Sequence, residues 1–91
     1  MPPPAILKQV QALPANPGVY IMKDTKGAVI YVGKATRLKD RVRSYFGPQG
    51  RHGRLIGRAL EAVARIDHEP MPSELAALLR ESRLIREHRP P

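Results

Sequence analysis

Two short apolar runs separated by turn residues stand near the start of the chain. Residues 18–23 and 28–33 are rich in β-branched and aromatic side chains, which favour strands. The residues between them, 24–27, supply turn chemistry, because Gly27 can adopt a positive φ. The pattern predicts a β-hairpin here, and a third, edge strand at residues 66–69, just before a proline.

A four-residue loop at 24–27 sets the pairing of the two hairpin strands. Lys23 then faces Ala28, and counting back along the strands places Tyr20 opposite Tyr31. Cross-strand partners share one face of a sheet. The two phenols are therefore expected to lie side by side.

Helical spacing marks three further segments before the C-terminal one. An early stretch carries Ile6, Leu7 and Val10, and a later helix is expected over about residues 54–64. Between them, a helix is expected to begin after Thr36 as its N-cap. Its apolar positions recur at Leu38, Val42, Tyr45 and Phe46. After the hairpin the pattern therefore turns helical.

The last helix has the clearest signals. Ser73 can cap it, and Glu74 in its first turn suits the positive end of the helix dipole. Its apolar stripe, which we expect to face the core, consists of Leu75, Leu78, Leu79 and Ile85. At about 100° per residue, Glu81 projects roughly 95° from the middle of that stripe. Its carboxylate is therefore expected at the shoulder of the buried face, where it can reach a cleft.

The charge of the chain indicates a polyanionic ligand. Sixteen Lys and Arg against eight Asp and Glu give a formal net charge of +8. Between positions 34 and 58, Asp40 is the only acid among many bases. Such a basic stretch is typical of nucleic-acid binding. The residues expected to contact nucleic-acid phosphates are Lys34, Arg37, Lys39, Arg41, Arg43, Arg51 and Arg54. The low aromatic content of 4% argues against single-strand base stacking.

Length and composition exclude several classes of protein. Ninety-one residues make one small domain, and the absence of Cys excludes disulfides and thiolate metal sites. A small domain without such cross-links suggests a reducing compartment or attachment to a larger protein. No apolar run suits a signal peptide or a membrane span, so we expect a cytoplasmic location. The three His residues are scattered and are interpreted as surface residues.

One constellation stands out: residues 18–20 read Gly-Val-Tyr and residues 31–33 read Tyr-Val-Gly, followed by Lys34, by Arg41 in a helix and by Glu81 on a distant helix. This arrangement resembles the GIY-YIG nuclease family, and within it the UvrC-type branch that includes the short homologue Cho. The resemblance implies an α+β fold, with a small three-stranded antiparallel sheet flanked by helices.

The resemblance covers about residues 13–90 and implies roles for individual side chains. Tyr31 looks like the catalytic tyrosine, Tyr20 like its partner, and Glu81 like the single metal ligand. The other implied site residues are the cations Lys34 and Arg41 and a further tyrosine, Tyr45. Two features depart from the family pattern. Arg80 stands where an apolar residue is common, and the chain ends at Pro90-Pro91 without the usual Asn after the last helix, which suggests a part of a longer protein.

These residue types suit phosphodiester hydrolysis. A lone carboxylate, with waters and a phosphate oxygen, is a usual environment for Mg²⁺, and Mn²⁺ is expected to substitute. Arg41 can fork onto phosphate oxygens. A free phenol has a pKa of about 10, and the ammonium group of Lys34 is placed to favour the phenolate of Tyr31. We expect Tyr31 to deprotonate the attacking water, leaving 5′-phosphate and 3′-hydroxyl ends.

The resemblance further implies an incision in nucleotide excision repair, in the nucleoid, with UvrA- and UvrB-type partners and mainly backbone contacts to DNA. Simpler readings stay open. The tyrosines can be a stacked cross-strand pair, Lys34 and Arg41 can be phosphate contacts only, and Glu81 can be a surface residue paired with Arg80 or Arg83. The alternative function is a non-catalytic, basic nucleic-acid-binding module. A ribosomal-type RNA binder fits the charge but explains neither the tyrosine spacing nor Glu81.

Overall fold

The computed structural model describes residues 4–46 and 54–90, which form one three-stranded antiparallel sheet and four helices. The strands are β1 (Gly18–Lys23), β2 (Val29–Ala35) and β3 (Arg65–Pro70). The helices are α1 (Pro4–Gln11), α2 (Leu38–Phe46), α3 (Arg54–Ala62) and α4 (Glu74–His88). The predicted α+β architecture is confirmed. None of the helices in the described ranges is long and apolar enough to cross a membrane.

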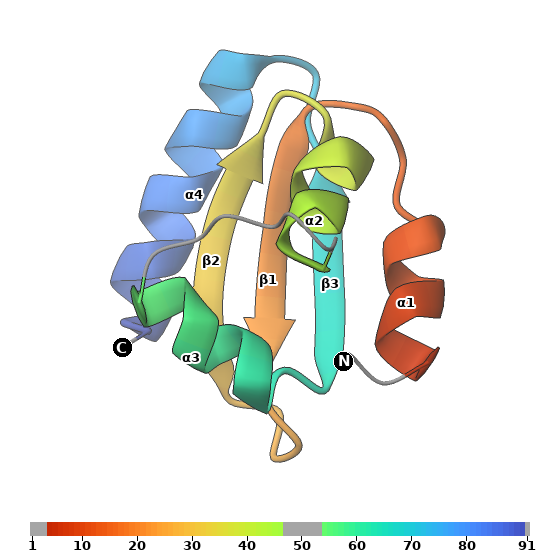
Figure 1. Ribbon diagram of the computed structural model, residues 1–91. Coiled ribbons are helices and arrows are strands. Elements are labelled where there is room, and N and C mark those ends of the chain that lie inside the picture. Colours follow the sequence, from red (N-terminus) through yellow and green to blue (C-terminus); the bar gives the residue numbers. More distant parts are fainter. Residues whose placement is uncertain (1–3, 47–53, 91) are drawn as a thin grey trace.

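The sheet lies between two unequal layers of helices (Figure 1). Helices α1, α2 and α3 cover one face and enclose the larger core cluster, which includes Tyr20, Met22, Leu38 and Val42. Helix α4 covers the other face, over a smaller cluster that includes Val19, Ile21, Val32, Ala77 and Leu84. The strand order is β2-β1-β3, so β3 is an edge strand as predicted and β2 forms the opposite edge.

Two backbone amides, one on the edge of the sheet and one at the start of α2, donate hydrogen bonds to neighbouring segments. The amide of Ile66, on the outer edge of β3, donates to the Gln9 side chain on α1 at 2.7 Å. At the start of α2, the amide of Leu38 donates to the Asn16 carbonyl at 3.1 Å. Thr36 is not the N-cap that the sequence predicts, because its hydroxyl donates to the Glu74 carboxylate at 2.8 Å instead. The start of α2 is therefore held by the loop before β1.

The register of the hairpin differs from the prediction by two residues. Tyr20 pairs with Gly33 and Tyr31 pairs with Met22, because the loop extends to residue 28 and the register shifts between residues 22 and 23. A shift of two keeps every side chain on its expected face. The two phenols therefore still lie side by side, with ring centroids 6.1 Å apart.

The rotational setting of α4 also differs from the prediction. Ser73 caps the helix as expected, accepting a hydrogen bond from the Ala76 amide at 3.1 Å. The buried side chains of α4 are Ala77 and Leu84. The predicted core stripe is exposed to solvent: Leu75, Leu78, Leu79 and Ile85. The expectation is wrong because the spacing of apolar residues carries no information about polar contacts, such as the hydrogen bond that Arg80 donates to Glu69 on β3.

Replacing Gly33 is expected to destabilise the fold. A Cβ at this position would collide with the ring of Tyr20, which is 1% exposed and cannot move aside without disturbing the core. Gly33→Ala should lower the free energy of unfolding by about 1–3 kcal/mol, the usual cost of overpacking. Urea denaturation measures the loss. Thr25→Ala, in the exposed turn, is the control and should change it by less than about 0.5 kcal/mol. An unchanged midpoint for Gly33→Ala would contradict this close contact.

Alkaline pH is expected to destabilise the domain through Tyr20. In the unfolded chain tyrosine ionises near its ordinary pKa of 10.0, whereas burial and the hydrogen bond with Tyr45 raise the pKa of Tyr20 in the folded protein. Its stabilising contribution is complete below the ordinary pKa and falls by about 1.4 kcal/mol per pH unit above it. Urea denaturation at a series of alkaline pH values should show this slope. It should be shallower in Tyr20→Phe, and equal slopes would speak against the idea.

Candidate active site

Three tyrosines from three elements meet at one place on the helix-rich face of the sheet. Tyr20 comes from β1, Tyr31 from β2 and Tyr45 from α2. The hydroxyls of Tyr20 and Tyr45 are 2.6 Å apart and share a buried hydrogen bond. The Tyr20 ring is stacked on that of Tyr31 and tilted by 58° against that of Tyr45. Tyr20 is fully buried and Tyr31 is partly exposed, so Tyr31 is the phenol that a ligand can reach.

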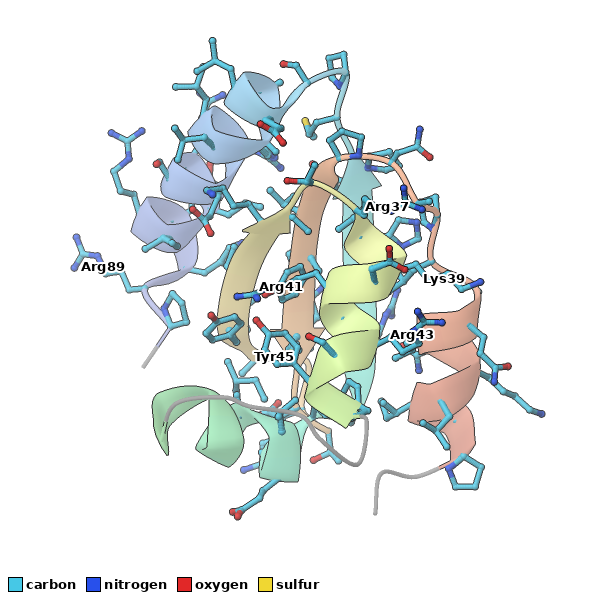
Figure 2. All side chains as sticks on the ribbon, turned by 45° about the horizontal axis from the view of Figure 1, so that its top comes forward. Arg37, Lys39, Arg41, Arg43, Tyr45 and Arg89 are labelled. Atoms are coloured by element: carbon cyan, nitrogen blue, oxygen red, sulfur yellow. The ribbon has the colours of Figure 1, made fainter. Side chains whose placement is uncertain are left out.

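Arg41 adds a cation to this group of phenols. It lies one helical turn before Tyr45, and its guanidinium carbon is 5.4 Å from the centre of the Tyr45 ring. Figure 2 shows Arg41 extending from α2 toward β2, whereas Lys39 and Arg43 point away on the other side of the helix. The nearby Tyr45 and Tyr20 raise the pKa of Arg41, and the Arg41 side chain remains exposed. Its charge is therefore permanent and accessible.

An open groove begins beside this cluster and runs between the end of β2 and the outer side of α2. Its volume is 510 Å³. The side chains that line it come from residues 34–37 and from the first half of α2: Lys34, Ala35, Thr36, Arg37, Asp40, Arg41 and Ser44. Three of the cations predicted to contact phosphate, Lys34, Arg37 and Arg41, therefore meet in one groove. Thr36 and Ser44 also line it, although the sequence suggested no binding role for either.

The remaining predicted DNA contacts are less well gathered. Asp40 accepts a hydrogen bond from Arg37 at 2.8 Å and lies 3.5 Å from Arg43, so it partly neutralises both cations. Lys39 lies on the far side of α2 from Arg41. Arg51 and the side chain of Arg54 lie outside the described residues. The groove residues, and not the whole basic segment, are therefore the candidate phosphate-binding surface.

Glu81 approaches the cluster from the other layer of the molecule. It lies on the half-buried side of α4, and α4 packs mainly on β2. Burial, Tyr45 and the negative charge of Glu81 raise the pKa of Tyr31, whereas the charge of Arg41 lowers it. Glu81 and Arg41 are thus both close enough to act on the same phenol, from opposite layers. Of these three residues, only Arg41 lines the groove described above.

The acids of the described ranges suit a cation site built on one carboxylate. No group of three or more His, Cys, Asp or Glu side chains converges within residues 4–46 and 54–90. In the same part of the chain, no side chain forms a hydrogen bond or ion pair with the Glu81 carboxylate, and Arg80 is paired with Glu69 instead. A half-buried carboxylate that has no side-chain partner within the described residues fits a hard divalent cation that keeps most of its ligands as water and phosphate oxygen.

Comparisons with known proteins agree with this geometry. The sequence model of the family described as UvrC-like GIY-YIG domain matches residues 16–91. The UvrABC system protein C of Desulforapulum autotrophicum is 45% identical over 87 residues, which are 96% of this chain and 14% of that protein. That of Dehalococcoides mccartyi is 43% identical over 90 residues, 99% of this chain and 15% of that protein. The chain therefore spans about one seventh of the length of these relatives.

Solved structures give the same result. The crystal structure of the GIY-YIG N-terminal endonuclease domain of UvrC from Thermotoga maritima, bound to magnesium as its catalytic divalent cation, matches with a TM-score of 0.84 and 36% identity. The match covers 97% of this chain and 94% of that domain. Crystal structures of the same domain with one tyrosine replaced by phenylalanine are also bound to the catalytic divalent cation. The chain belongs to the UvrC-like GIY-YIG family of endonuclease domains.

Proposed function

We propose that this domain hydrolyses one phosphodiester bond of DNA with a single divalent metal ion. The observation that carries the proposal is the cluster of Tyr31, Tyr20 and Tyr45 with Arg41, which also lines the groove, together with the charge of Glu81 that acts on Tyr31. Phosphodiester hydrolysis needs a proton acceptor, a cation for the phosphate oxygens and a metal ligand. Tyr31, Arg41 and Glu81 are of the types required.

Glu81 is the proposed metal ligand. Its carboxylate is unpaired within the described part of the chain, and its charge acts on Tyr31, the phenol on which the charge of Arg41 also acts. Mg²⁺ is the proposed ion, with Mn²⁺ as a substitute, because both accept carboxylate and water oxygens. Bound there, the ion would polarise a phosphate oxygen and stabilise the charge of the transition state. The magnesium in the Thermotoga maritima domain supports this choice.

Tyr31 is the proposed general base. It is the least buried member of the tyrosine cluster, and the ring of Tyr20 stacks against it from the core side. Burial raises the pKa of Tyr31 most, and Tyr45 and the Glu81 charge raise it further, whereas Arg41 lowers it. Neutralising the Glu81 charge would therefore remove one of the obstacles to deprotonation. Tyr31 would take a proton from the attacking water, whose oxygen would bond to phosphorus. The bond from phosphorus to the 3′ oxygen would break, and that oxygen would take up a proton from solvent, which leaves a 5′-phosphate and a 3′-hydroxyl. Tyr20 and Tyr45 would keep the phenol and α2 in register through their shared hydrogen bond.

Arg41 and Lys34 are the proposed phosphate contacts at the reacting centre. A guanidinium can donate two parallel hydrogen bonds to a phosphate, which suits the charge that develops in the transition state. Lys34 is exposed at the end of β2 and lines the same groove, so it can add a second positive charge without fixed geometry. Arg37 extends the groove and contributes to binding of the DNA backbone.

We propose further that residues 1–91 form the nuclease domain of a longer protein that makes an incision during nucleotide excision repair. The relatives named UvrABC system protein C support this, since each is about seven times as long as this chain. UvrA- and UvrB-type proteins would be the partners, and the cytoplasmic nucleoid would be the place of action. The open groove, lined mainly by cations and small polar side chains, favours contacts to the DNA backbone over sequence specificity.

Glu81→Ala is expected to remove metal-dependent nicking of supercoiled DNA while DNA binding survives. Loss of the only proposed protein ligand should lower the rate with Mg²⁺ or Mn²⁺ by more than about 100-fold. Tyr31→Phe should lower it by about 100-fold or more without changing cation affinity, because it removes only the proton acceptor. Nicking assays and calorimetric cation titrations measure the two effects separately.

Glu87→Ala is the matched control for this experiment. Glu87 is an exposed acid on the same helix that lies 3.9 Å from Arg83, and its loss should leave nicking unchanged. Equal activity of Glu81→Ala and the parent chain would overturn the proposed metal site. If both this domain and the full-length protein bound DNA without nicking it, the result would favour the alternative function, a non-catalytic nucleic-acid-binding module.

Arg41 and Arg37 are expected to separate chemistry from binding. Arg41→Ala removes donors aimed at the reacting phosphate, so the nicking rate at saturating DNA should fall by about 10²–10³. Arg37→Ala removes one backbone contact, so the slope of log affinity against log salt should fall by about one, with little change in that rate. Fluorescence anisotropy over a salt series measures the slope. Lys26→Ala, in the hairpin turn at the other end of β2, is the control and should change neither. Identical effects of Arg41→Ala and Arg37→Ala would contradict the assigned roles.

A further inference from the structure

Helix α4 exposes most of its large apolar side chains to solvent. Only Ala77 and Leu84 are buried against the sheet. Leu78 and Ile85 are 43% and 41% exposed, and the outermost side chains, Leu75 and Leu79, are 65% and 63% exposed. Burial of apolar surface alone therefore does not explain which side of α4 packs on β1 and β2.

A modest roll of α4 about its own axis would bury more apolar surface. Successive residues on a helix are about 100° apart, which places Leu78 and Ile85 next to Glu81, on the flank nearer to β2. Rolling that flank toward the sheet would cover these two side chains, and burial of apolar surface is favourable. The same roll would turn Glu81 under the helix and away from Tyr31. The hydrophobic effect on α4 thus opposes the rotational setting in which Glu81 faces Tyr31.

An ion pair on the opposite flank resists this roll. The Nε and Nη2 atoms of Arg80 donate to the two carboxylate oxygens of Glu69 on β3, at 2.8 and 3.1 Å. Such bidentate contacts fix orientation as well as distance. The two side chains are 31% and 37% exposed, so separating them would leave two half-buried charges without partners. Thr36 adds a second tie at the start of the helix through its hydrogen bond with Glu74.

Adjacent residues on a helix do not face one another. Arg80 therefore points toward β3 while Glu81 points toward β2, and each position determines the other. We propose that Glu69 and Arg80 are positioning residues: their ion pair selects the rotational setting of α4 in which Glu81 faces Tyr31. This inference rests on the proposed function for the role of Glu81, but the setting of α4 is a property of the fold and is measurable without cation or DNA.

Thiol labelling tests the setting directly, because the chain has no Cys. Single cysteines are introduced as Leu84→Cys, at a site that is 4% exposed, and as Ile85→Cys, at a site that is 41% exposed. Arg80→Gln is then added to each. The roll predicts opposite changes: labelling at position 84 should become about tenfold faster and labelling at position 85 slower. General loosening of α4 would accelerate both, and no change at either site would also overturn the proposal.

Two further variants separate the ion pair from a simple loss of charge. Arg83→Gln, which removes an exposed cation from the same helix, should leave both labelling rates unchanged within about twofold. The exchanged pair, Glu69→Arg with Arg80→Glu, should return both rates toward those of the parent chain. Failure of this rescue while thermal unfolding stays cooperative would count against the ion pair as the selecting contact.

Cation affinity connects the setting to the site. If Arg80 positions Glu81, Arg80→Gln should weaken Mn²⁺ binding by about tenfold, a usual effect of residues that orient a metal ligand, whereas Arg83→Gln should not. Calorimetric titration measures this without any turnover. A parent chain that binds no cation would refute the proposed metal site and leave the labelling result to decide the setting of α4. Normal binding by Arg80→Gln, with the opposite labelling changes present, would refute the link between them.

Discussion

Tyr20 lies with its ring over Gly33, where the neighbouring strand has no side chain. This contact lets a large phenol lie across the middle of the hairpin while it stays 1% exposed. A hydroxyl so deeply buried needs a partner, and it finds one in Tyr45, 2.6 Å away on α2. The position of α2 over the sheet therefore depends on Gly33, which has no Cβ. The position of Arg41, one turn before Tyr45, depends on it as well.

The site lies at β2 because an edge strand can be reached from both layers of helices. Arg41 comes from α2 on one face and Glu81 from α4 on the other, and their charges shift the pKa of Tyr31 in opposite directions. A phenol on the central strand would be covered on both sides, as Tyr20 is. The opposite edge, β3, is closed by α1 through the hydrogen bond between Ile66 and Gln9. Among the described residues, the β2 edge is thus the edge of the sheet at which the charges of Glu81 and Arg41 act on a tyrosine.

Sequence reasoning succeeded where local chemistry determines structure. The strands, the edge position of β3 and the Ser73 cap follow from residue types over a few positions. The face shared by Tyr20 and Tyr31 was also predictable, although their pairing was not. A period of two preserves the face when the register moves by two residues. The extended turn beside the register shift is held by the Asp24 carboxylate, which accepts hydrogen bonds from the amides of Lys26 and Ala28, and composition does not specify these contacts. The site could therefore be predicted as a group of residues but not as a set of contacts.

The setting of α4 shows why apolar spacing is insufficient for a helix with two possible faces. Counting leucines favours the stripe that contains Leu75 and Leu79, yet the side that packs on the sheet combines two buried apolar residues with Arg80. The partner of Arg80, Glu69, lies on a different element, and nothing in the spacing of α4 indicates it. A half-exposed ion pair adds little to the free energy of unfolding. A small contribution is nevertheless enough to select one rotational setting of α4 when two settings are close in free energy. The placement of Glu81 is then decided by a long-range polar contact, which hydrophobic periodicity cannot reveal.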